Sequence, residues 1–99
     1  AKLHDDGVHF RSLHLGNIVV MPSGDFGLID ISDMSIYPWG LLTNTRIRNF
    51  SHVWRYPKDI RMLGIEKWLI VENAYFDYCQ LSSSSVQKIK RELQLLAEL

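Results

Sequence analysis

The chain has 99 residues, about enough to enclose one small hydrophobic core, so two independently folded domains are not expected. Hydrophobic residues make up 46% of the sequence and aromatic residues 11%, which excludes a disordered or low-complexity segment. Lys and Arg number 11, and Asp and Glu also number 11, so the formal net charge is zero. Any attraction to an anionic partner therefore has to be local.

Cysteine content and hydropathy point to a reducing compartment. The single cysteine, Cys79, excludes an intramolecular disulfide, and no Cys and His cluster predicts a structural zinc. No apolar stretch approaches the roughly 20 residues that a membrane span requires, and no basic and apolar leader is recognisable. We therefore expect a cytoplasmic protein. Because the sequence begins at Ala1 within residues typical of a helix, we expect residues 1–99 to be one domain of a longer protein.

The N-terminal segment is predicted to be the end of a helix. Residues 1–6 are typical of the last turns of a helix, with Leu3 on the apolar side. Gly7 suits the left-handed conformation that often ends a helix. A polar stretch at residues 9–16 follows without a predicted regular element.

A β-hairpin is predicted next, over about residues 17–31. Residues 17–21 are β-branched and residues 26–31 are apolar, and the segment between them is rich in turn-forming residues. Residues 32–42 alternate polar with bulky side chains and contain proline and glycine, so we interpret them as an ordered loop.

From Thr43 onward the apolar spacing changes to about 3.6 residues, which predicts helices. Thr45 is expected to cap the first helix, and Pro57 to start a short one that ends at Gly64. Serines 82–85 separate two longer helices and cap the second. The residues expected to face inward are Ile47, Phe50, Trp54, Ile65, Trp68, Leu69, Tyr75, Phe76, Cys79, Val86, Ile89, Leu93 and Leu96. The predicted fold class is α+β, with one hairpin packed on three or four helices.

Oxygen-bearing side chains stand at both ends of the predicted hairpin. Asn17 opens its first strand and Asp30 closes its second. Paired strands lie about 5 Å apart. An amide oxygen and a carboxylate at adjacent strand ends can therefore converge on a hard cation such as Mg²⁺, which prefers oxygen ligands and accepts phosphate beside them.

Residues 3–17 and 27–33 resemble the catalytic loop and the metal-binding hairpin of the protein-kinase-like superfamily. The likeness is closest to its bacterial small-molecule and lipopolysaccharide-core kinases, whose loop reads His-x-Asp-Leu-His-x-Gly-Asn. Residues 48–50 (Arg-Asn-Phe) and 55–57 (Arg-Tyr-Pro) resemble segments of toluene tolerance-type proteins of that group. In that pattern the catalytic Asp stands five positions before the metal-binding Asn, and a second metal-binding Asp stands thirteen positions after it. Ser12, Asn17 and Asp30 occupy these three positions. The residues that also match the family's residue types are Leu13, His14, Gly16 and Asn17.

The resemblance implies the C-terminal lobe of a kinase-like protein whose full-length form transfers phosphate from ATP, with Mg²⁺, to a hydroxyl group. The acceptor would be a lipopolysaccharide-core sugar or another small molecule. Asn17 and Asp30 would hold the metal and nucleotide, with Asp33 as a further metal candidate. Ser12 would mark the substrate hydroxyl, and His14 would assist near the phosphates. The glycine-rich loop and strand lysine of the N-terminal lobe are not in this sequence, so the fragment alone is expected to be inactive.

The tripeptide Asp25-Phe26-Gly27 has the letters of a kinase metal motif, but it lies only eight residues after Asn17. Its Asp and Gly fall in the expected turn, where backbone requirements alone favour them. Using it as the metal motif would leave too few residues for the hairpin. Asp30 is the better counterpart because an apolar strand precedes it.

Ser12 stands where the family places its catalytic carboxylate, and this departure leaves three interpretations open. Phosphoryl transfer depends mainly on positioning and charge neutralisation, so activity can survive the replacement, with His14 or His9 as a substitute base. Either histidine can instead be a hydrogen-bonded organiser of the loop. In the second interpretation, the chain is a pseudokinase that binds or scaffolds a partner without catalysis. The third interpretation is a small helical adaptor with a fortuitous motif, which would place Asn17 and Asp30 on opposite sides of the hairpin.

A basic run opposed only by Asp59 suggests an anionic partner or a solvated helix face; it comprises Arg46, Arg48, Arg55, Lys58 and Arg61. Arg48, His52 and Arg55 are expected together on the outer face of their helix. Zero net charge and the lack of a reader motif argue against nucleic acid. The expected partner is a small-molecule or glycolipid substrate. Contact with the inner-membrane surface, and self-association through apolar surface left by the missing lobe, are open alternatives.

Glu72 falls on the apolar side of its predicted helix, between Trp68 and Phe76. A carboxylate there is costly unless it is paired. We therefore expect an internal salt bridge to Arg48 or Arg61. No catalytic role is expected, since Glu72 lies far along the chain from the predicted metal residues.

Overall fold

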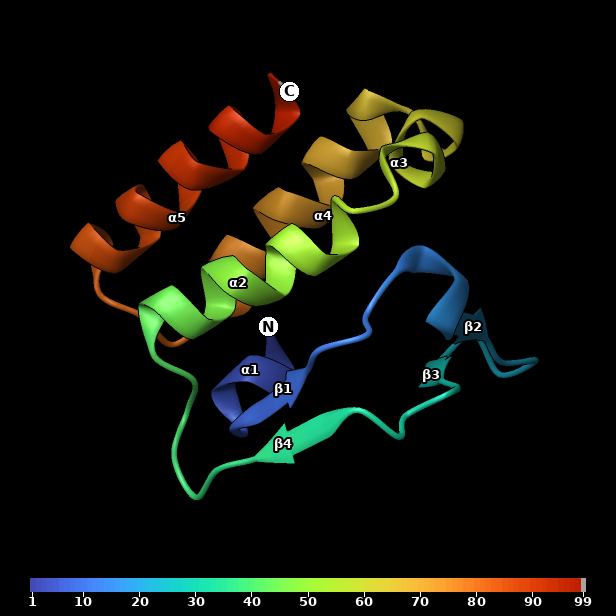
Figure 1. The fold of residues 1–99 in the computed structure, drawn as a ribbon, viewed down its shortest axis with the longest axis horizontal. Helices are drawn as coiled ribbons and strands as arrows, with labels where there is room; N and C mark the ends of the chain where they lie inside the picture. The colour runs from blue at the N-terminus through green and yellow to red at the C-terminus, as the bar shows by residue number, and fades with distance from the viewer. Residues whose placement is uncertain (99) are drawn as a thin grey trace.

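The structure is a computed structural model that describes residues 1–98 and combines two short antiparallel sheets with five α-helices (Figure 1). It confirms the predicted α+β class. In Figure 1, helices α2, α4 and α5 lie together on one side of the molecule, and α1 and the strands lie on the other. The elements in chain order are α1 (Lys2–Asp5), β1 (Val8–Phe10), the 3-10 helix η1 (Leu15–Asn17), β2 (Ile18–Val20), β3 (Phe26–Leu28), β4 (Met34–Ile36), α2 (Thr43–Val53), α3 (Pro57–Leu63), α4 (Ile65–Tyr78) and α5 (Ser83–Ala97).

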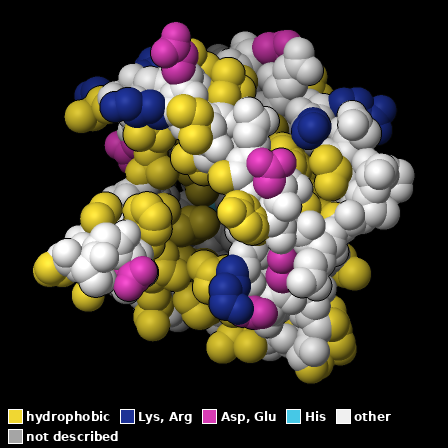
Figure 2. Space-filling view, turned by 180° about the vertical axis from the view of Figure 1, so that it is seen from behind, with side chains coloured by type: hydrophobic (Ala, Val, Ile, Leu, Met, Phe, Trp, Pro, Cys, Tyr) yellow, Lys and Arg dark blue, Asp and Glu magenta, His cyan; other side chains and the backbone are white. Residues whose placement is uncertain are grey.

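Strands β2 and β3 form the predicted hairpin, in a shorter version than residues 17–31. The strands pair antiparallel with Ile18 opposite Leu28. In Figure 2 this hairpin projects from the body, and hydrophobic side chains cover much of it. Val20 is 70% exposed and Phe26 is 76% exposed. The hairpin is therefore held mainly by its own backbone pairing and by its base.

Strands β1 and β4 form a second sheet that the sequence analysis missed. Val8 stands opposite Ile36, and Phe10 opposite Met34, in an antiparallel pair. The interpretation of residues 32–42 as a loop without a regular element is therefore wrong, as is the absence of a strand in residues 9–16. Each strand has only three residues. A run of that length is too short to show an alternating pattern, and its partner lies far along the chain.

The two sheets follow one another along the same two chain segments. Residues 11–17 connect β1 to β2, and residues 29–33 connect β3 to β4. At the β1–β4 end, Arg11 N–H donates to the carbonyl of Asp33 at 3.0 Å, and at the β2–β3 end, Ile29 N–H donates to the carbonyl of Asn17 at 2.9 Å. Residues 11–17 and 29–33 thus form two facing arms, each anchored at both ends. We call this arrangement the frame, and it contains the predicted metal, nucleotide and catalytic residues Ser12, His14, Asn17, Asp30 and Asp33.

Gly7 makes the turn between α1 and β1, as predicted. Its φ is +86°, which L side chains rarely adopt, and an added Cβ would collide with the carbonyl oxygens of Tyr37 and Trp39. The buried residue of α1 is His4, whereas Leu3 is 39% exposed. The placement of Leu3 on the inner side is therefore wrong, because hydrogen bonds to neighbouring helices hold His4 inside instead.

The helices begin and end close to their predicted positions, with one exception. Helix α2 begins at Thr43, after Leu42, so Thr45 is not its cap. The hydroxyl of Thr43 instead donates to Ser85 in α5 at 3.0 Å. Pro57 does open α3, which ends at Gly64, and the Ser82 hydroxyl caps α5 by accepting a hydrogen bond from the Ser85 backbone N–H at 3.3 Å.

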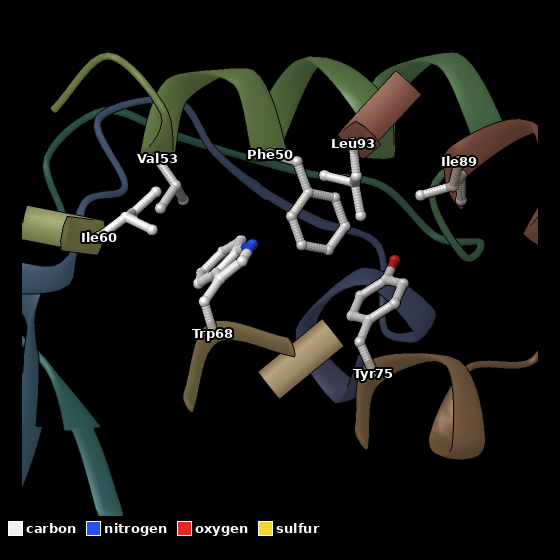
Figure 3. Close-up of a cluster of buried hydrophobic side chains, with 7 residues drawn as sticks. All are labelled: Phe50, Val53, Ile60, Trp68, Tyr75, Ile89 and Leu93. Carbon is white, nitrogen blue, oxygen red and sulfur yellow. The ribbon is translucent and has the colours of Figure 1, made fainter. Parts of the chain in front are cut away.

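The hydrophobic core lies between α2, α3, α4 and α5 (Figure 3). Trp68 and Tyr75, seven residues apart on α4, are 2% and 7% exposed and point toward α2. The inward placement of Ile65 and Leu69 is wrong, since they are 52% and 48% exposed. The contacts of α4 follow one narrow stripe, so its other apolar residues stay at the surface. The core consists of Phe50, Val53, Ile60, Trp68, Tyr75, Ile89 and Leu93.

The expected salt bridge of Glu72 to Arg48 or Arg61 is also wrong. Its carboxylate accepts a hydrogen bond from the indole N–H of Trp68, one turn earlier on α4. Burial raises the pKa of Glu72, and this hydrogen bond opposes the rise. A neighbour on the same helix thus satisfies Glu72 without an arginine from another element.

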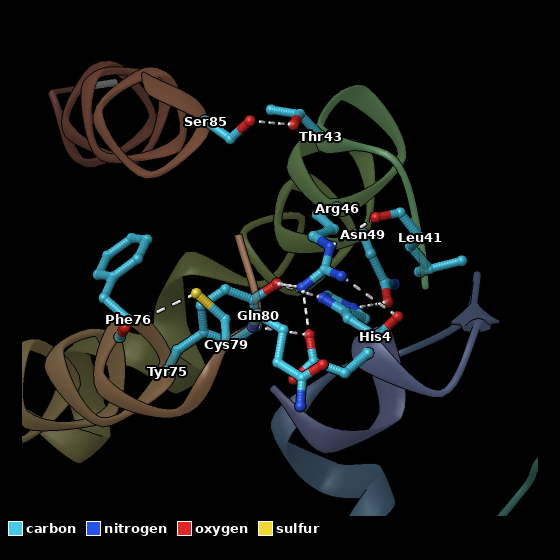
Figure 4. Close-up of polar contacts among 11 residues, drawn as sticks. His4, Leu41, Thr43, Arg46, Asn49, Tyr75, Phe76, Cys79, Gln80 and Ser85 are labelled. Carbon is cyan, nitrogen blue, oxygen red and sulfur yellow. Dashed lines mark hydrogen bonds and ion pairs between the residues drawn. The ribbon is translucent and has the colours of Figure 1, made fainter. Parts of the chain in front are cut away.

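A chain of buried hydrogen bonds connects the helical core to the frame, and Figure 4 shows the residues that contribute side chains to it, Arg46, Tyr75, His4 and Asn49. The Arg46 guanidinium donates to the Tyr75 hydroxyl at 3.3 Å, and the Tyr75 hydroxyl lies 2.7 Å from Nδ1 of His4. Nε2 of His4 lies 2.8 Å from Oδ1 of Asn49, whose Nδ2 donates to the carbonyl of Phe10 at 2.6 Å. Burial lowers the pKa of His4 to about 4, so its ring is neutral at pH 7. We call these five residues the polar chain.

Arg46 is therefore not part of a basic surface. Its side chain is 2% exposed, and NH1 forms an ion pair with Asp5 at 2.9 Å. Burial alone would raise the pKa of Asp5, but hydrogen bonds from the Gln80 N–H and Arg46 hold the pKa below its ordinary value.

Among residues 1–98, none of the helices combines the length and apolar composition that spanning a bilayer requires.

We predict that Asp5→Asn destabilises the fold by about 3–5 kcal/mol, because it leaves the buried Arg46 guanidinium without its counter-charge. Asp6→Asn is the matched control: it breaks the exposed ion pair with Lys2 and should cost less than about 1 kcal/mol. Urea denaturation monitored by tryptophan fluorescence measures both values. Equal losses in the two variants would contradict the importance of the Asp5 pair.

Candidate functional site

A pocket of about 430 Å³ opens between the two arms of the frame and the C-terminal end of α2. One side of its lining comes from the arms, and the other from His52, Arg55 and Tyr56. The structure brings all five predicted site residues into this pocket, from two separate segments of the chain: Ser12, His14, Asn17, Asp30 and Asp33.

Asn17 is fixed at the base of the pocket by both ends of its amide. Its side chain is buried, Oδ1 accepts a hydrogen bond from the His14 N–H at 3.0 Å, and Nδ2 donates to the carbonyl of Ile29 at 3.2 Å. Since an amide oxygen has two lone pairs, Oδ1 keeps one for a further partner. The Asn17 side chain thus ties the two arms together and can still contribute one oxygen to a ligand.

Asp30 follows directly after Ile29, the residue that is hydrogen-bonded to Asn17 through both its N–H and its carbonyl. Its carboxylate is exposed and has no hydrogen-bond partner among residues 1–98. Asp30 is also the only residue other than glycine in this part of the chain with a positive φ, at 56°. Such a conformation costs free energy and is concentrated at functional sites. Asn17 and Asp30 line the same pocket, whereas an adaptor with a fortuitous motif was expected to place them on opposite sides of the hairpin.

Asp25 of the Asp-Phe-Gly tripeptide lies elsewhere. It belongs to the turn of the β2–β3 hairpin, where its carboxylate accepts a hydrogen bond from the Ser23 hydroxyl at 3.0 Å. It does not line the pocket. The turn explains this Asp without a ligand.

Ser12 and Asp33 face each other across the frame. The Ser12 hydroxyl donates to Oδ2 of Asp33 at 3.4 Å. Oδ1 of Asp33 accepts a hydrogen bond from Nε of Arg11 at 2.8 Å, and Arg11 also donates to the hydroxyl of Ser35. One carboxylate oxygen of Asp33 is therefore bound to Arg11, and the other lies beside the Ser12 hydroxyl.

Three histidines lie at or near the pocket: His14 in the loop, and the buried pair of His9 and His52, of which His52 also lines the pocket. Nδ1 of His14 accepts a hydrogen bond from the Gly16 N–H at 3.0 Å, and its ring lies 5.1 Å from that of Tyr56. His14 thus organises the loop as well as lining the pocket. His9, the alternative base, is buried and does not line the pocket.

The His9 ring stacks on His52 with the centroids 5.7 Å apart. Burial lowers the pKa of both, and the charges of Arg11 near His9 and Arg55 near His52 lower it further. Sequence reasoning missed His52 as part of the site. Its expected place on the outer face of a helix with Arg48 and Arg55 is wrong: His52 is 6% exposed against His9 of β1, and Arg55 lies beyond the end of α2.

The side chains at the pocket supply only part of the ligand set of a magnesium ion. Within residues 1–98, no group of three or more His, Cys, Asp or Glu side chains lies close enough together to hold a metal ion. Asn17 and Asp30 offer one amide oxygen and one carboxylate. Mg²⁺ is commonly bound in this way, with one or two protein oxygens and the rest of its ligands from substrate phosphates and water. The residues present therefore fit a metal that enters together with a nucleotide.

Comparison of the chain with family models, with curated proteins and with solved structures found no match. The functional assignment consequently rests on the residues and geometry of the chain itself.

We predict that Asn17→Asp lowers the free energy of unfolding by about 1–3 kcal/mol, because a carboxylate cannot donate to the carbonyl of Ile29 and leaves it unsatisfied. The control is Asn73→Asp on the exposed face of α4, which should change stability by less than about 0.5 kcal/mol. Urea denaturation measures both. A loss in Asn17→Asp no larger than that in the control would show that the amide does not hold the arms together.

Proposed function

We propose that this chain is the C-terminal lobe of a kinase-like phosphotransferase. In the full-length protein it supports transfer of a phosphate group from ATP, with Mg²⁺, to a hydroxyl of a lipopolysaccharide-core sugar or similar small molecule. The observation that carries the proposal is that Asn17 and Asp30, thirteen positions apart, both line one pocket, which the loop residue Ser12 also lines. The spacing is that of the family, and the backbone joins the two residues through Ile29.

The architecture supports this function because it holds oxygen ligands on two arms that are hydrogen-bonded to each other at both ends. Asn17 is immobilised by two hydrogen bonds, and Asp30 extends an unpaired carboxylate from a constrained backbone. Preorganised ligands of this kind reduce the ordering that binding otherwise requires. When bound, Mg²⁺ neutralises the charge of the transferring phosphate.

The opposite wall is suited to the substrate side of such a reaction. Tyr56 offers an aromatic ring beside His14, and Arg55 offers a guanidinium group. Sugars pack on aromatic rings, and guanidinium groups bind phosphates and carboxylates. The pocket thus combines an acidic, metal-binding arm with a wall that can receive a polar, anionic acceptor.

The test of the metal assignment is Asp30→Asn in the full-length protein. Asn tolerates a positive φ, so the variant should fold normally while Mg²⁺-dependent ATP binding weakens by at least about tenfold. Isothermal titration calorimetry with Mg²⁺ and a non-hydrolysable ATP analogue measures the affinity. The matched control, Asp25→Asn, changes the carboxylate of the decoy tripeptide and should bind as the wild type does. Unchanged binding in Asp30→Asn would refute the assignment.

A second candidate function, a pseudokinase that binds a partner without catalysis, is favoured by one observation: Ser12 is not a carboxylate. ATP turnover by the full-length protein, with and without Ser12→Asp, separates the two. We expect substantial Mg²⁺-dependent release of ADP by the natural Ser12 form, which would rule out the scaffold. No turnover in the natural form and a large gain in Ser12→Asp would instead indicate decayed catalysis.

A further inference from the structure

Asp33 lies opposite the one position where the loop departs from the kinase pattern. Its Oδ2 is 3.4 Å from the Ser12 hydroxyl, and the two side chains come from different arms of the frame. The carboxylate is half-exposed and lines the pocket that contains Asn17 and Asp30. A carboxylate oxygen is therefore present next to position 12, although it comes from residue 33.

Two contacts hold this carboxylate in place. Arg11 binds Oδ1 at 2.8 Å, and the backbone of the same two residues is joined by the hydrogen bond from the Arg11 N–H to the Asp33 carbonyl at 3.0 Å. Arg11 also donates to Ser35, which immobilises its guanidinium group. The ion pair fixes Oδ1, so Oδ2 is the oxygen left for a further partner.

We propose that Asp33 is the catalytic base of this site and that Ser12 helps to position the acceptor hydroxyl beside it. The inference rests on the proposed phosphotransferase function. Oδ2 of Asp33 accepts the hydrogen bond of the acceptor hydroxyl and directs the oxygen lone pair toward the γ-phosphate. A base that must reach a substrate needs an oxygen free of other strong partners, and Oδ2 has only the long contact with Ser12.

The step balances without a further reactant. The O–H bond of the acceptor breaks and its proton passes to Oδ2 of Asp33. A bond forms between the acceptor oxygen and the γ-phosphorus, and the bond from that phosphorus to the oxygen bridging the β-phosphate breaks. The products are the phosphorylated acceptor and ADP.

This role also distinguishes Asp33 from Asp30. Asp30 has a carboxylate with no partner among residues 1–98 and suits a metal ion, whereas Asp33 already shares its charge with Arg11. A metal at Asp33 would have to compete with that guanidinium group. On the same arm, Asp30 thus binds the metal ion and Asp33 accepts the proton.

The experiment measures ADP release by the full-length protein, with water as the acceptor, together with binding of a Mg²⁺-bound non-hydrolysable ATP analogue. Asp33→Asn should lower turnover by about 10²–10⁴-fold and leave analogue binding within about threefold of the wild type. Adding Ser12→Asp to Asp33→Asn should restore turnover at least about tenfold, because the carboxylate is then supplied from the other arm. Asp25→Asn, outside the pocket, should change neither quantity.

Arg11→Gln separates catalysis from support of the frame. It breaks the ion pair but keeps the carboxylate, so turnover should fall far less than in Asp33→Asn. Equal losses in Arg11→Gln and Asp33→Asn, without rescue by Ser12→Asp, would make Asp33 a structural residue and overturn the proposal. Loss of analogue binding in Asp33→Asn would make it a metal ligand and also overturn it.

ADP release and analogue binding by the wild-type protein distinguish failure of this inference from failure of the proposed function. A wild type that releases ADP while Asp33→Asn does so equally fast overturns the role of Asp33 alone. A wild type that binds the analogue but releases no ADP overturns the transfer activity as well. No binding of the analogue at all refutes the nucleotide site itself.

Discussion

The polar chain from Arg46 to the carbonyl of Phe10 is the interaction on which the arrangement of the site depends. It begins in α2, passes through Tyr75 of α4 and His4 of α1, and returns through Asn49 to the last residue of β1. Each member is buried, so each unmade bond would leave an uncompensated polar group. The residue after Phe10 opens the first arm of the frame. The helical core therefore determines where the loop begins.

The frame holds the two arms, and the site residues on them, in fixed positions around the pocket. Backbone hydrogen bonds join the arms at both ends, and the Asn17 amide joins them again at the base of the pocket. Because these contacts are mainly to backbone atoms, the geometry depends little on which side chains fill the remaining positions. The conformation of the loop therefore places few demands on the side chain at position 12. A carboxylate from the facing arm, that of Asp33, reaches the same space.

The sequence predicted features whose signals are local and missed those that depend on distant partners. The helices and the hairpin were found because their periods and their glycine, proline and serine boundaries lie within short windows. The β1–β4 pair was missed because two three-residue strands show no period. Leu3 rather than His4 was placed on the inner side of the first helix, and Arg46 on a basic surface, because the partners of His4 and Arg46 lie on other elements. The spacing from Asn17 selected Asp30, which lines the same pocket, whereas nothing local indicated that His52 would be covered.

The backbone of Asp30 restricts which side chains can evolve there. With φ at 56°, the position admits Gly, Asn or Asp readily, while a β-branched residue would force the arm to rearrange. Of the three residues that the backbone accepts, aspartate alone brings a negative charge. The strained backbone at this position thus presents a charged carboxylate to the pocket between the arms.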